Sequence, residues 1–212
     1  MTITATSLVD GTYDLLRERI LDGRLPAGTH LRQIELAREL GVSRTPLREA
    51  FARLAVDGLV ELQANRGARV REVASDDIAA AFEARLVIEP AVARLAADRR
   101  GDDDLQELRT QLGRQRDAVS VSDSFDANRA FHIAIAAAAR NPHLYRIALS
   151  VWGGRVGMRT YELMRPSVLA RDLSEHGELL AALTRRDAAA AEQIARLHVG
   201  SSRDEVSALL AV

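Results

Sequence analysis

Residues 36–70, LARELGVSRTPLREAFARLAVDGLVELQANRGARV, decide the fold of the first third of the chain. A short helical pattern ends at Gly41, and a second one follows after a turn of only a few residues. Pro46 lies in the first turn of this second helix, where its missing N–H costs nothing. Apolar and polar residues then alternate over 59–62 and 68–71, which is typical of the two strands of a β-hairpin. Two helices, a tight turn and a hairpin predict a winged helix-turn-helix.

The second helix of this module carries two arginines at its N-terminal end. Arg44 and Arg48 are four residues apart, so they lie on one face of the helix, beside its apolar face. A recognition helix presents this end to the base edges of DNA, and arginine can donate two hydrogen bonds to O6 and N7 of guanine. Hydroxyl side chains and free N–H groups in the first turn can bind phosphate. The alternative is a solvated helix whose arginines pair with Glu49 and Asp57.

The same stretch, preceded by ILDGRLPAGTHL at residues 20–31, closely resembles the DNA-binding domain of the GntR family of bacterial transcriptional regulators. The resemblance covers about residues 8–72. It implies base and phosphate contacts from the recognition helix, and contacts with the neighbouring minor groove from the tip of the wing. The expected DNA-binding residues are Arg32, Ser43, Arg44, Thr45, Arg48, Asn65, Arg66 and Gly67.

The composition excludes several classes of protein. The 212 residues contain no cysteine, which rules out disulfides, thiolate metal sites and a cysteine nucleophile. No apolar run reaches the roughly 18–20 residues of a membrane span, and the first residues lack a signal-peptide pattern, so we expect a cytoplasmic protein. The formal net charge is −1, but residues 43–71 contain six arginines and three acidic residues. The positive charge that DNA binding needs is therefore concentrated in the winged module.

Beyond Val73 the alternating pattern disappears and only helical patterns follow. The sequence therefore predicts a mainly α protein. A winged helix-turn-helix of α+β type at residues 1–74 precedes an all-α, helical-bundle ligand-binding domain at residues 75–212. Glycine, proline and capping residues divide this second domain into six expected helices, at about 77–99, 103–119, 123–140, 142–165, 168–185 and 187–211.

Three histidines of the helical part have positions that suit a shared metal site. His132 follows Asn128 by four residues, so both side chains lie on one helix face. His176 and His198 each lie 11 residues from Asp187, the joint between two consecutive helices, so they come to the same level in an antiparallel hairpin. Three imidazoles and one oxygen donor can hold a divalent transition metal inside a helical bundle. The alternative for any one of them is an ordinary core or surface histidine.

A second resemblance concerns this helical part. The stretches EARLVIEPAVARLAADRR at 83–100, NRAFHIAIAAAARNPHL at 128–144 and SEHGELLAAL at 174–183, followed by ARLHV, are similar to the FCD ligand-binding domain of one large GntR subfamily. Many members of that subfamily bind a metal through an acidic residue and three histidines. The resemblance implies a divalent transition metal, and Zn²⁺ or Ni²⁺ suits an imidazole-rich site best. The implied ligands are Asn128, His132, His176 and His198.

Asn128 stands where the subfamily often has an acidic residue. Its neutral amide should lower the metal affinity, but the ion would keep its full charge of +2, which favours an anionic effector. Asp126 cannot replace it, because two residues along a helix correspond to a rotation of about 200°. Arg85 matches a family position that can point into the same cavity and bind a carboxylate, and the alternative is a surface pair with Glu89. Three further pocket candidates, among which the spacing does not select, are Trp152, Arg155 and Arg159.

The sequence therefore predicts a ligand-responsive transcriptional regulator that acts as a repressor. It would bind a pseudo-palindromic operator of double-stranded DNA as a homodimer, and would be released or repositioned when a small carboxylate effector enters the helical domain. One alternative is the same regulator with a metal-free effector pocket, and a more distant one is a metal-dependent enzyme. The enzyme is disfavoured because no acidic residue has a helical spacing to the three histidines that would mark it as a general base.

Overall fold

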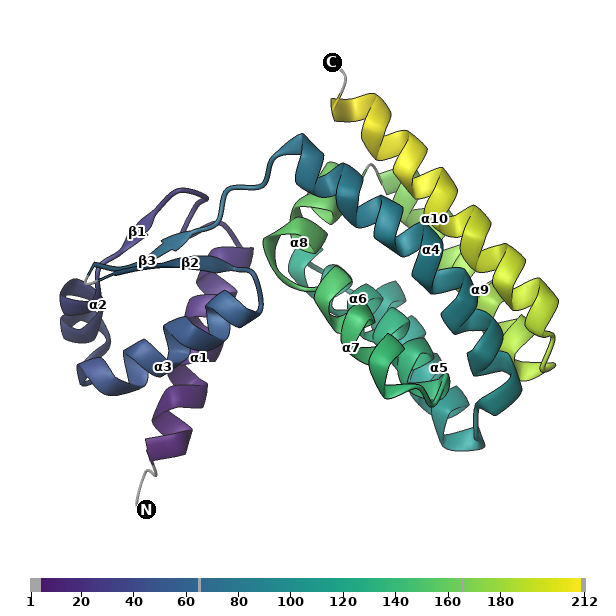
Figure 1. The fold of residues 1–212 in the computed structure, drawn as a ribbon, viewed down its shortest axis with the longest axis horizontal. Coiled ribbons are helices and arrows are strands. Elements are labelled where there is room, and N and C mark those ends of the chain that lie inside the picture. Colours follow the sequence, from purple (N-terminus) through teal and green to yellow (C-terminus); the bar gives the residue numbers. More distant parts are fainter. Residues whose placement is uncertain (1–4, 65, 165, 211–212) are drawn as a thin grey trace. The chain divides into compact units, whose positions relative to one another are not determined.

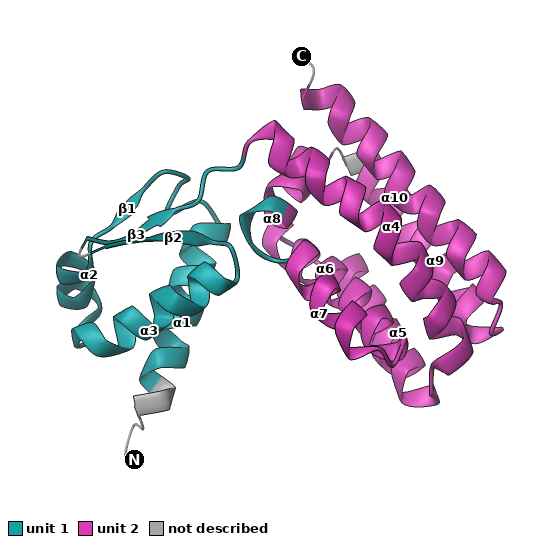
Figure 2. Cartoon of the chain, viewed as in Figure 1, with its two compact units in different colours: residues 1–73, 153–156 teal, residues 74–152, 157–212 magenta. Residues whose placement is uncertain are grey.

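The computed structural model describes residues 5–64, 66–164 and 166–210 (Figure 1). The chain forms two compact units (Figure 2). The first comprises residues 1–73 and 153–156, and the second comprises residues 74–152 and 157–212. No helix in the described ranges is long and apolar enough to cross a bilayer.

The first unit has the helices and the hairpin that the sequence predicts. Its strands form a small antiparallel sheet in the order β1-β3-β2, and buried leucines, among them Leu16, Leu47 and Leu54, fill the core beneath. Strand β1 is absent from the sequence prediction, because two residues are too few to show an alternating pattern. The elements are α1 (Ala5–Leu21), β1 (His30–Leu31), α2 (Gln33–Leu40), α3 (Arg44–Val56), β2 (Val60–Gln63) and β3 (Gly67–Val70).

Two glycines allow the turn and the hairpin to form. Gly41 has a φ of 65° and ends α2 in the left-handed conformation, and the next residue, Val42, donates a backbone hydrogen bond to Ala37. Gly67 has a φ of 101°, and a Cβ atom there would lie 2.1 Å from the carbonyl oxygen of Leu31. Gly67 is an expected DNA-binding residue, and the structure shows that the close pairing of β1 with β3 requires it in any case.

From Ser75 onward the described chain is helical. Helices α4, α9 and α10 run side by side, and α5 packs against α6 (Figure 1). Their inner faces form a core of small and aliphatic side chains that also contains the fully buried Phe131. The helices are α4 (Ser75–Arg99), α5 (Asp102–Asp117), α6 (Val121–Ala138), α7 (Pro142–Val151), α8 (Gly154–Leu163), α9 (Pro166–Thr184) and α10 (Ala188–Leu210).

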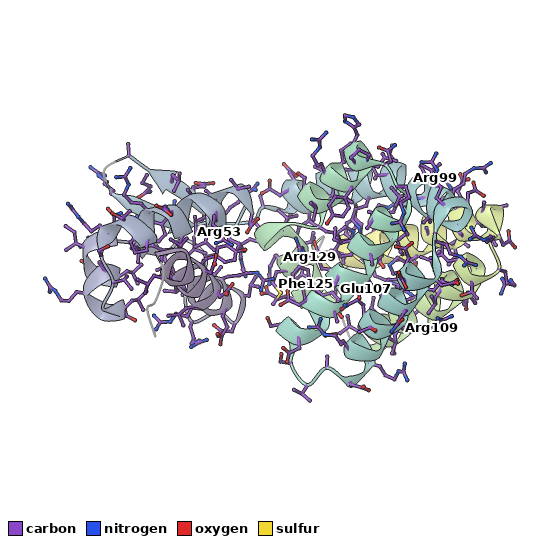
Figure 3. The ribbon with its side chains drawn as sticks, turned by 90° about the horizontal axis from the view of Figure 1, so that it is seen from below. Arg53, Arg99, Glu107, Arg109, Phe125 and Arg129 are labelled. Atoms are coloured by element: carbon purple, nitrogen blue, oxygen red, sulfur yellow. The ribbon has the colours of Figure 1, made fainter. Side chains whose placement is uncertain are left out.

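The prediction of a single helix over residues 142–165 is wrong. Helix α7 ends at Val151 and α8 begins at Gly154, which has a φ of 65° that no continuing α-helix can contain. Trp152, one of the pocket candidates from the sequence, is the C-cap residue of α7 at this break. Arg129 lies on α6 (Figure 3). Its side chain donates a hydrogen bond of 3.0 Å to the carbonyl oxygen of Trp152 and so holds this end of α7.

Candidate metal centre and nucleic-acid interface

The three histidines singled out in the sequence lie together in the second unit. Helix α6 supplies His132, α9 supplies His176 and α10 supplies His198, and all three are buried. The Nε2 atom of His176 lies 3.1 Å from Nε2 of His132 and 3.3 Å from Nε2 of His198. Three ring nitrogens from three helices therefore converge on one point.

Each of these rings is held from behind by an oxygen. Nδ1 of His132 lies 3.0 Å from a carboxylate oxygen of Glu89, and Nδ1 of His198 lies 2.7 Å from one of Glu175. A carboxylate only accepts hydrogen bonds, so both Nδ1 atoms carry the proton and both Nε2 atoms present a lone pair.

The third ring is oriented in the same way. Nδ1 of His176 lies 3.0 Å from the amide oxygen of Gln115, which leaves the lone pair of its Nε2 facing the other two. Burial and the neighbouring rings hold the pKa of His176 well below its usual value, and burial lowers the pKa of His132 to about 4. His132 and His176 are therefore uncharged at neutral pH, and a cation bound between the rings would relieve the repulsion between their lone pairs.

The spacing of the nitrogens suits a transition metal. Two nitrogens bound to zinc at about 2.0–2.1 Å and at tetrahedral angles lie about 3.3 Å apart. The observed separations of 3.1 and 3.3 Å agree with this value. The residues present therefore fit a divalent metal ion, and the oxygens behind the rings are the outer partners that such a site needs.

Asn128 lies in the hydrogen-bond network of this centre. It is buried on α6, one turn before His132. Its side-chain oxygen accepts a hydrogen bond of 3.2 Å from Gln115, whose own amide oxygen faces His176. The structure thus places Asn128 next to the centre, with its oxygen turned toward Gln115.

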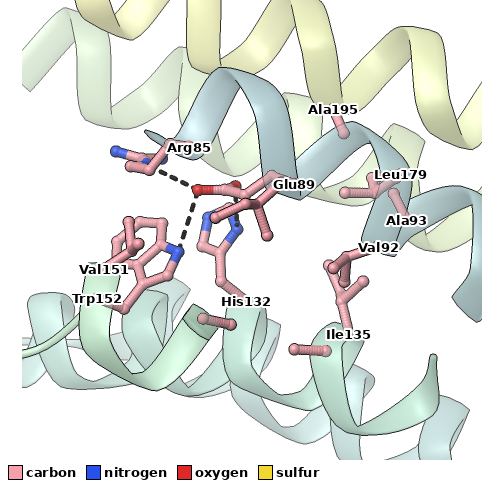
Figure 4. Close-up of a pocket in the computed structure, with 13 residues that line it drawn as sticks. Arg85, Glu89, Val92, Ala93, His132, Ile135, Val151, Trp152, Leu179 and Ala195 are labelled. Atoms are coloured by element: carbon pink, nitrogen blue, oxygen red, sulfur yellow. Dashed lines mark hydrogen bonds and ion pairs between the residues drawn. The ribbon is translucent and has the colours of Figure 1, made fainter. Parts of the chain in front are cut away.

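Arg85 lies on α4, close to the same centre, and is buried (Figure 4). Its Nε donates a hydrogen bond of 2.6 Å to Glu89, and its guanidinium lies 4.1 Å from the centre of the Trp152 ring. The indole N–H of Trp152 donates to the same oxygen of Glu89 at 3.1 Å, and its ring stacks on His132 at 4.2 Å. The alternative prediction, a surface pair of Arg85 with Glu89, is confirmed for the pair but wrong for the surface, because both side chains are largely buried.

Glu89 is ionised in this setting. Burial by itself would raise the pKa of its carboxyl, but the charges of Arg85 and His132 and their hydrogen bonds hold that pKa well below its usual range. A small pocket adjoins this cluster (Figure 4). Its polar lining comes from Arg85, Glu89, His132 and Trp152, and the aliphatic lining comes from Ile88, Val92, Ala93, Ile135, Ala136, Ala148, Val151, Leu179 and Ala195.

Sequence reasoning missed Gln115, Glu175 and the contact of Glu89 with His132. Each of these three residues contacts a histidine on a different helix, so no spacing along one helix reveals the pair. Two weak signals exist, since Glu89 follows Arg85 by four residues and Glu175 directly precedes His176. Solvated helices carry both patterns as well, so neither pattern identifies a partner of a buried histidine.

The second candidate site is an open groove in the first unit, between α3 and the hairpin. Arg44, Thr45, Arg48 and Gly67 line it. Ser43 is the N-cap residue of α3, and its side chain makes no capping hydrogen bond. All of these except Gly67 are exposed, as a surface for phosphates and base edges requires.

The alternative ion pairs of the recognition helix are not formed among the described residues. Asp57 accepts a short hydrogen bond from Tyr13, Glu49 is exposed, and neither pairs with Arg44 or Arg48. Of the other expected residues, Arg32 is exposed and pairs with Glu35 at 3.0 Å, Arg66 is exposed at the wing, and Asn65 lies outside the described residues.

Comparison with known proteins finds a family model for each of the two parts of the chain. The model of the gntR family of bacterial regulatory proteins matches residues 8–70, and the FCD domain model matches residues 77–201. A probable D-xylose utilization operon transcriptional repressor of Paenarthrobacter nicotinovorans is 34% identical over 147 residues, which are 68% of this chain and 65% of that protein. The repressor RspR of Escherichia coli K12 is 28% identical over 199 residues, covering 92% of this chain and 86% of that protein.

A solved structure shows the same architecture. E. coli McbR/YncC superposes with a TM-score of 0.74 at 25% identity, over 97% of both chains. The two family models together span most of the sequence, in the order of the DNA-binding module and the helical unit. The chain therefore belongs to the gntR family of bacterial regulatory proteins, carries an FCD domain, and is a transcriptional regulator rather than an enzyme.

Proposed function

We propose that this chain is a transcriptional repressor whose helical domain senses a small organic acid through a bound divalent metal ion. Residues 1–74 form the DNA-binding domain and residues 75–212 the effector domain. The observation that carries the proposal is the convergence of three buried Nε2 atoms at 3.1 and 3.3 Å. Two of the relatives described above are named repressors, which supports the direction of regulation.

The metal would be held by His132, His176 and His198, with Asn128 as the oxygen donor and Zn²⁺ or Ni²⁺ as the ion. When bound, the ion supplies a Lewis acid that attracts a carboxylate oxygen. Because the ligands are neutral, the ion keeps its positive charge, and the guanidinium of Arg85, whose charge Glu89 partly neutralises, lies nearby. The metal ion and Arg85 together suit a small carboxylate effector.

On the DNA side, the recognition helix would present Arg44 and Arg48 to base edges. One such helix reads only a few base pairs, so specific binding needs two half-sites and a symmetric homodimer on a pseudo-palindromic operator. Phosphate contacts would come from the first turn of α3 and from the wing. The proposed DNA-binding set is Arg32, Ser43, Arg44, Thr45, Arg48, Asn65, Arg66 and Gly67.

Replacing Arg44 or Arg48 with alanine should cost about 1–3 kcal/mol of specific DNA binding, because each removes a contact to base edges. The measurement is fluorescence anisotropy with an operator duplex, selected from random sequences by the wild-type protein, and with a scrambled duplex. Arg94→Ala is the matched control, since Arg94 is an exposed arginine of the helical unit that pairs with Glu192. If both variants discriminate between the two duplexes as well as the wild type, the assignment of the recognition helix is wrong.

Replacing Asn128 with aspartate should tighten metal binding at least about tenfold, or about 1.4 kcal/mol, because a charged oxygen replaces a neutral one beside the centre. Asn128→Ala should weaken it. Both affinities are measured by titrating Zn²⁺ in competition with a chelating dye. Equal affinities in wild type and both variants would show that position 128 does not contribute a ligand.

The proposal as a whole is tested on one purified sample of the full chain. Elemental analysis should find close to one divalent metal per chain, and the same sample should shift the selected operator duplex. A sample that contains metal but does not bind the DNA would contradict the proposed role as a DNA-binding repressor. DNA binding without metal would leave a regulator whose effector pocket is metal-free.

A further inference from the structure

Glu89 is shared by the proposed effector contact and the proposed metal centre (Figure 4). One oxygen of its carboxylate accepts from Nε of Arg85 at 2.6 Å and from the indole of Trp152 at 3.1 Å. The other oxygen faces Nδ1 of His132 at 3.0 Å. The Glu89 side chain is 12% exposed and that of Arg85 is 7% exposed, so solvent screens this chain of contacts only weakly. Hydrogen bonds thus connect Arg85 without a break to a ring of the histidine cluster.

Arg85 can receive a second acceptor while it holds Glu89. Its hydrogen bond to Glu89 uses Nε, and one face of its guanidinium packs over the Trp152 ring. A guanidinium carries five N–H donors in a planar fork, and a carboxylate binds to its outer edge. An effector carboxylate at the Nη groups would therefore lie on the far side of Arg85 from Glu89.

We propose that Glu89 is a positioning residue that couples carboxylate binding at Arg85 to metal binding at His132. This inference rests on the metal centre and the Arg85 contact of the proposed function, and it does not require the carboxylate to bind the ion directly. Without an effector, the positive charge of Arg85 acts on the carboxylate of Glu89. A carboxylate bound to Arg85 neutralises part of that charge. Glu89 then becomes a stronger acceptor for the N–H of His132, which raises the electron density at Nε2 and tightens the metal bond.

The coupling is positive and reciprocal. If a carboxylate raises the metal affinity by some factor, the metal must raise the carboxylate affinity by the same factor. Couplings between sites are typically about 5–150-fold, and at least about fivefold is expected here. A different route would be direct binding of the carboxylate to the metal, which also gives positive coupling but does not depend on the hydrogen bond between Glu89 and His132.

The experiment measures the Zn²⁺ affinity of the full chain with and without a carboxylate. The probes are acetate, pyruvate, lactate and succinate, each added to saturation and corrected for its own zinc binding. Carboxylate binding is followed by the fluorescence of Trp152, the single tryptophan of the sequence, which lies over Arg85 and against His132. The ratio of the two zinc affinities is the coupling factor.

Glu89→Gln separates the two routes. A glutamine whose carbonyl keeps accepting from Arg85 and Trp152 turns its NH₂ group toward the N–H of His132, where two donors oppose each other. Zinc affinity should fall by about 10–100-fold, as for other outer partners of metal ligands, and the coupling factor should fall to one. Nitrogen NMR of the metal-free chains should show the Nδ1–H form of His132 in wild type and a shift toward the Nε2–H form in the variant.

Glu83→Gln is the matched control, because it removes an exposed carboxylate from the same helix. It should leave both zinc affinity and coupling unchanged. If Glu89→Gln fails to fold, Glu89→Asp takes its place, since the shorter carboxylate cannot reach Arg85 and His132 together and the coupling must fall.

The outcomes distinguish this inference from the function on which it rests. Coupling that persists in the Glu89 variant overturns the inference, and assigns the effect to direct binding of the carboxylate to the metal. A wild-type chain that binds zinc but none of the four carboxylates overturns the proposed Arg85 effector site, and the coupling with it. Coupling that is lost in Glu89→Gln and kept in Glu83→Gln supports the inference.

Discussion

Replacing His176 with alanine is expected to reduce metal binding at least about 100-fold, so that almost none survives dialysis against a mild chelator. His176 is the central residue of the cluster, with its Nε2 within 3.3 Å of both other Nε2 atoms. Removing it leaves two nitrogen donors and the neutral amide oxygen of Asn128, which is a weaker ligand than the cysteine, histidine and carboxylate ligands of a stable zinc site. His132→Ala and His198→Ala should give the same result for the same reason.

The measurement is the metal content of wild type and variants by elemental analysis. His143→Ala is the matched control, because His143 is exposed at the start of α7 and should retain all of its metal. Metal that stays in all three buried variants would show that the ligands lie elsewhere. Negligible metal in the wild type as well would remove the metal from the proposal and leave Arg85 as the effector site.

The metal-free protein is expected to lose stability steeply in weak acid. A histidine in the unfolded chain has a pKa of about 6.5, whereas burial lowers that of folded His132 to about 4. The unfolded state therefore binds more protons between these two values, and the free energy of unfolding falls as the pH falls through that window. His132 alone should account for about 2 kcal/mol between pH 7 and pH 5, and the lowered pKa of His176 acts in the same direction.

Urea unfolding of chelator-treated protein, followed by Trp152 fluorescence, measures this effect in the helical unit. Saturating Zn²⁺ should shift the loss of stability to lower pH, because bound metal competes with protons for the same nitrogens. His143→Ala should keep the full pH dependence of the wild type. A free energy of unfolding that stays constant from pH 7 to pH 5 would contradict the lowered pKa values of the buried His132 and His176.

The winged module is the part of the fold that sequence reasoning predicts best. Gly41, Pro46 and the alternation after residue 59 act on their immediate neighbours, and local signals of this kind need no knowledge of the rest of the chain. Where the local signal is short, the prediction fails, as for the two residues of β1. It also fails at Gly154, because two adjacent glycines within a helical pattern do not reveal that the backbone adopts a positive φ there.

The sequence likewise predicts only part of the candidate metal centre. The joint at Asp187 correctly brings His176 and His198 to one level, because an antiparallel helix pair has a fixed register about its turn. The inclusion of His132 comes from the resemblance to the FCD domain, and in the structure its Nε2 lies 3.1 Å from that of His176. The spacing does not show that Asn128 turns its oxygen toward Gln115, since the partner comes from another helix.

By itself the sequence determined which residue types lie on which face of which helix, and therefore the fold, the family and the three histidines. Only the tertiary structure decided that the Arg85–Glu89 pair is buried and that oxygens from α4, α5 and α9 orient the rings. The physical reason is that helical periodicity acts over a few residues of one segment. Hydrogen bonds between helices depend on packing distances and side-chain rotamers, which arise only when the segments come together.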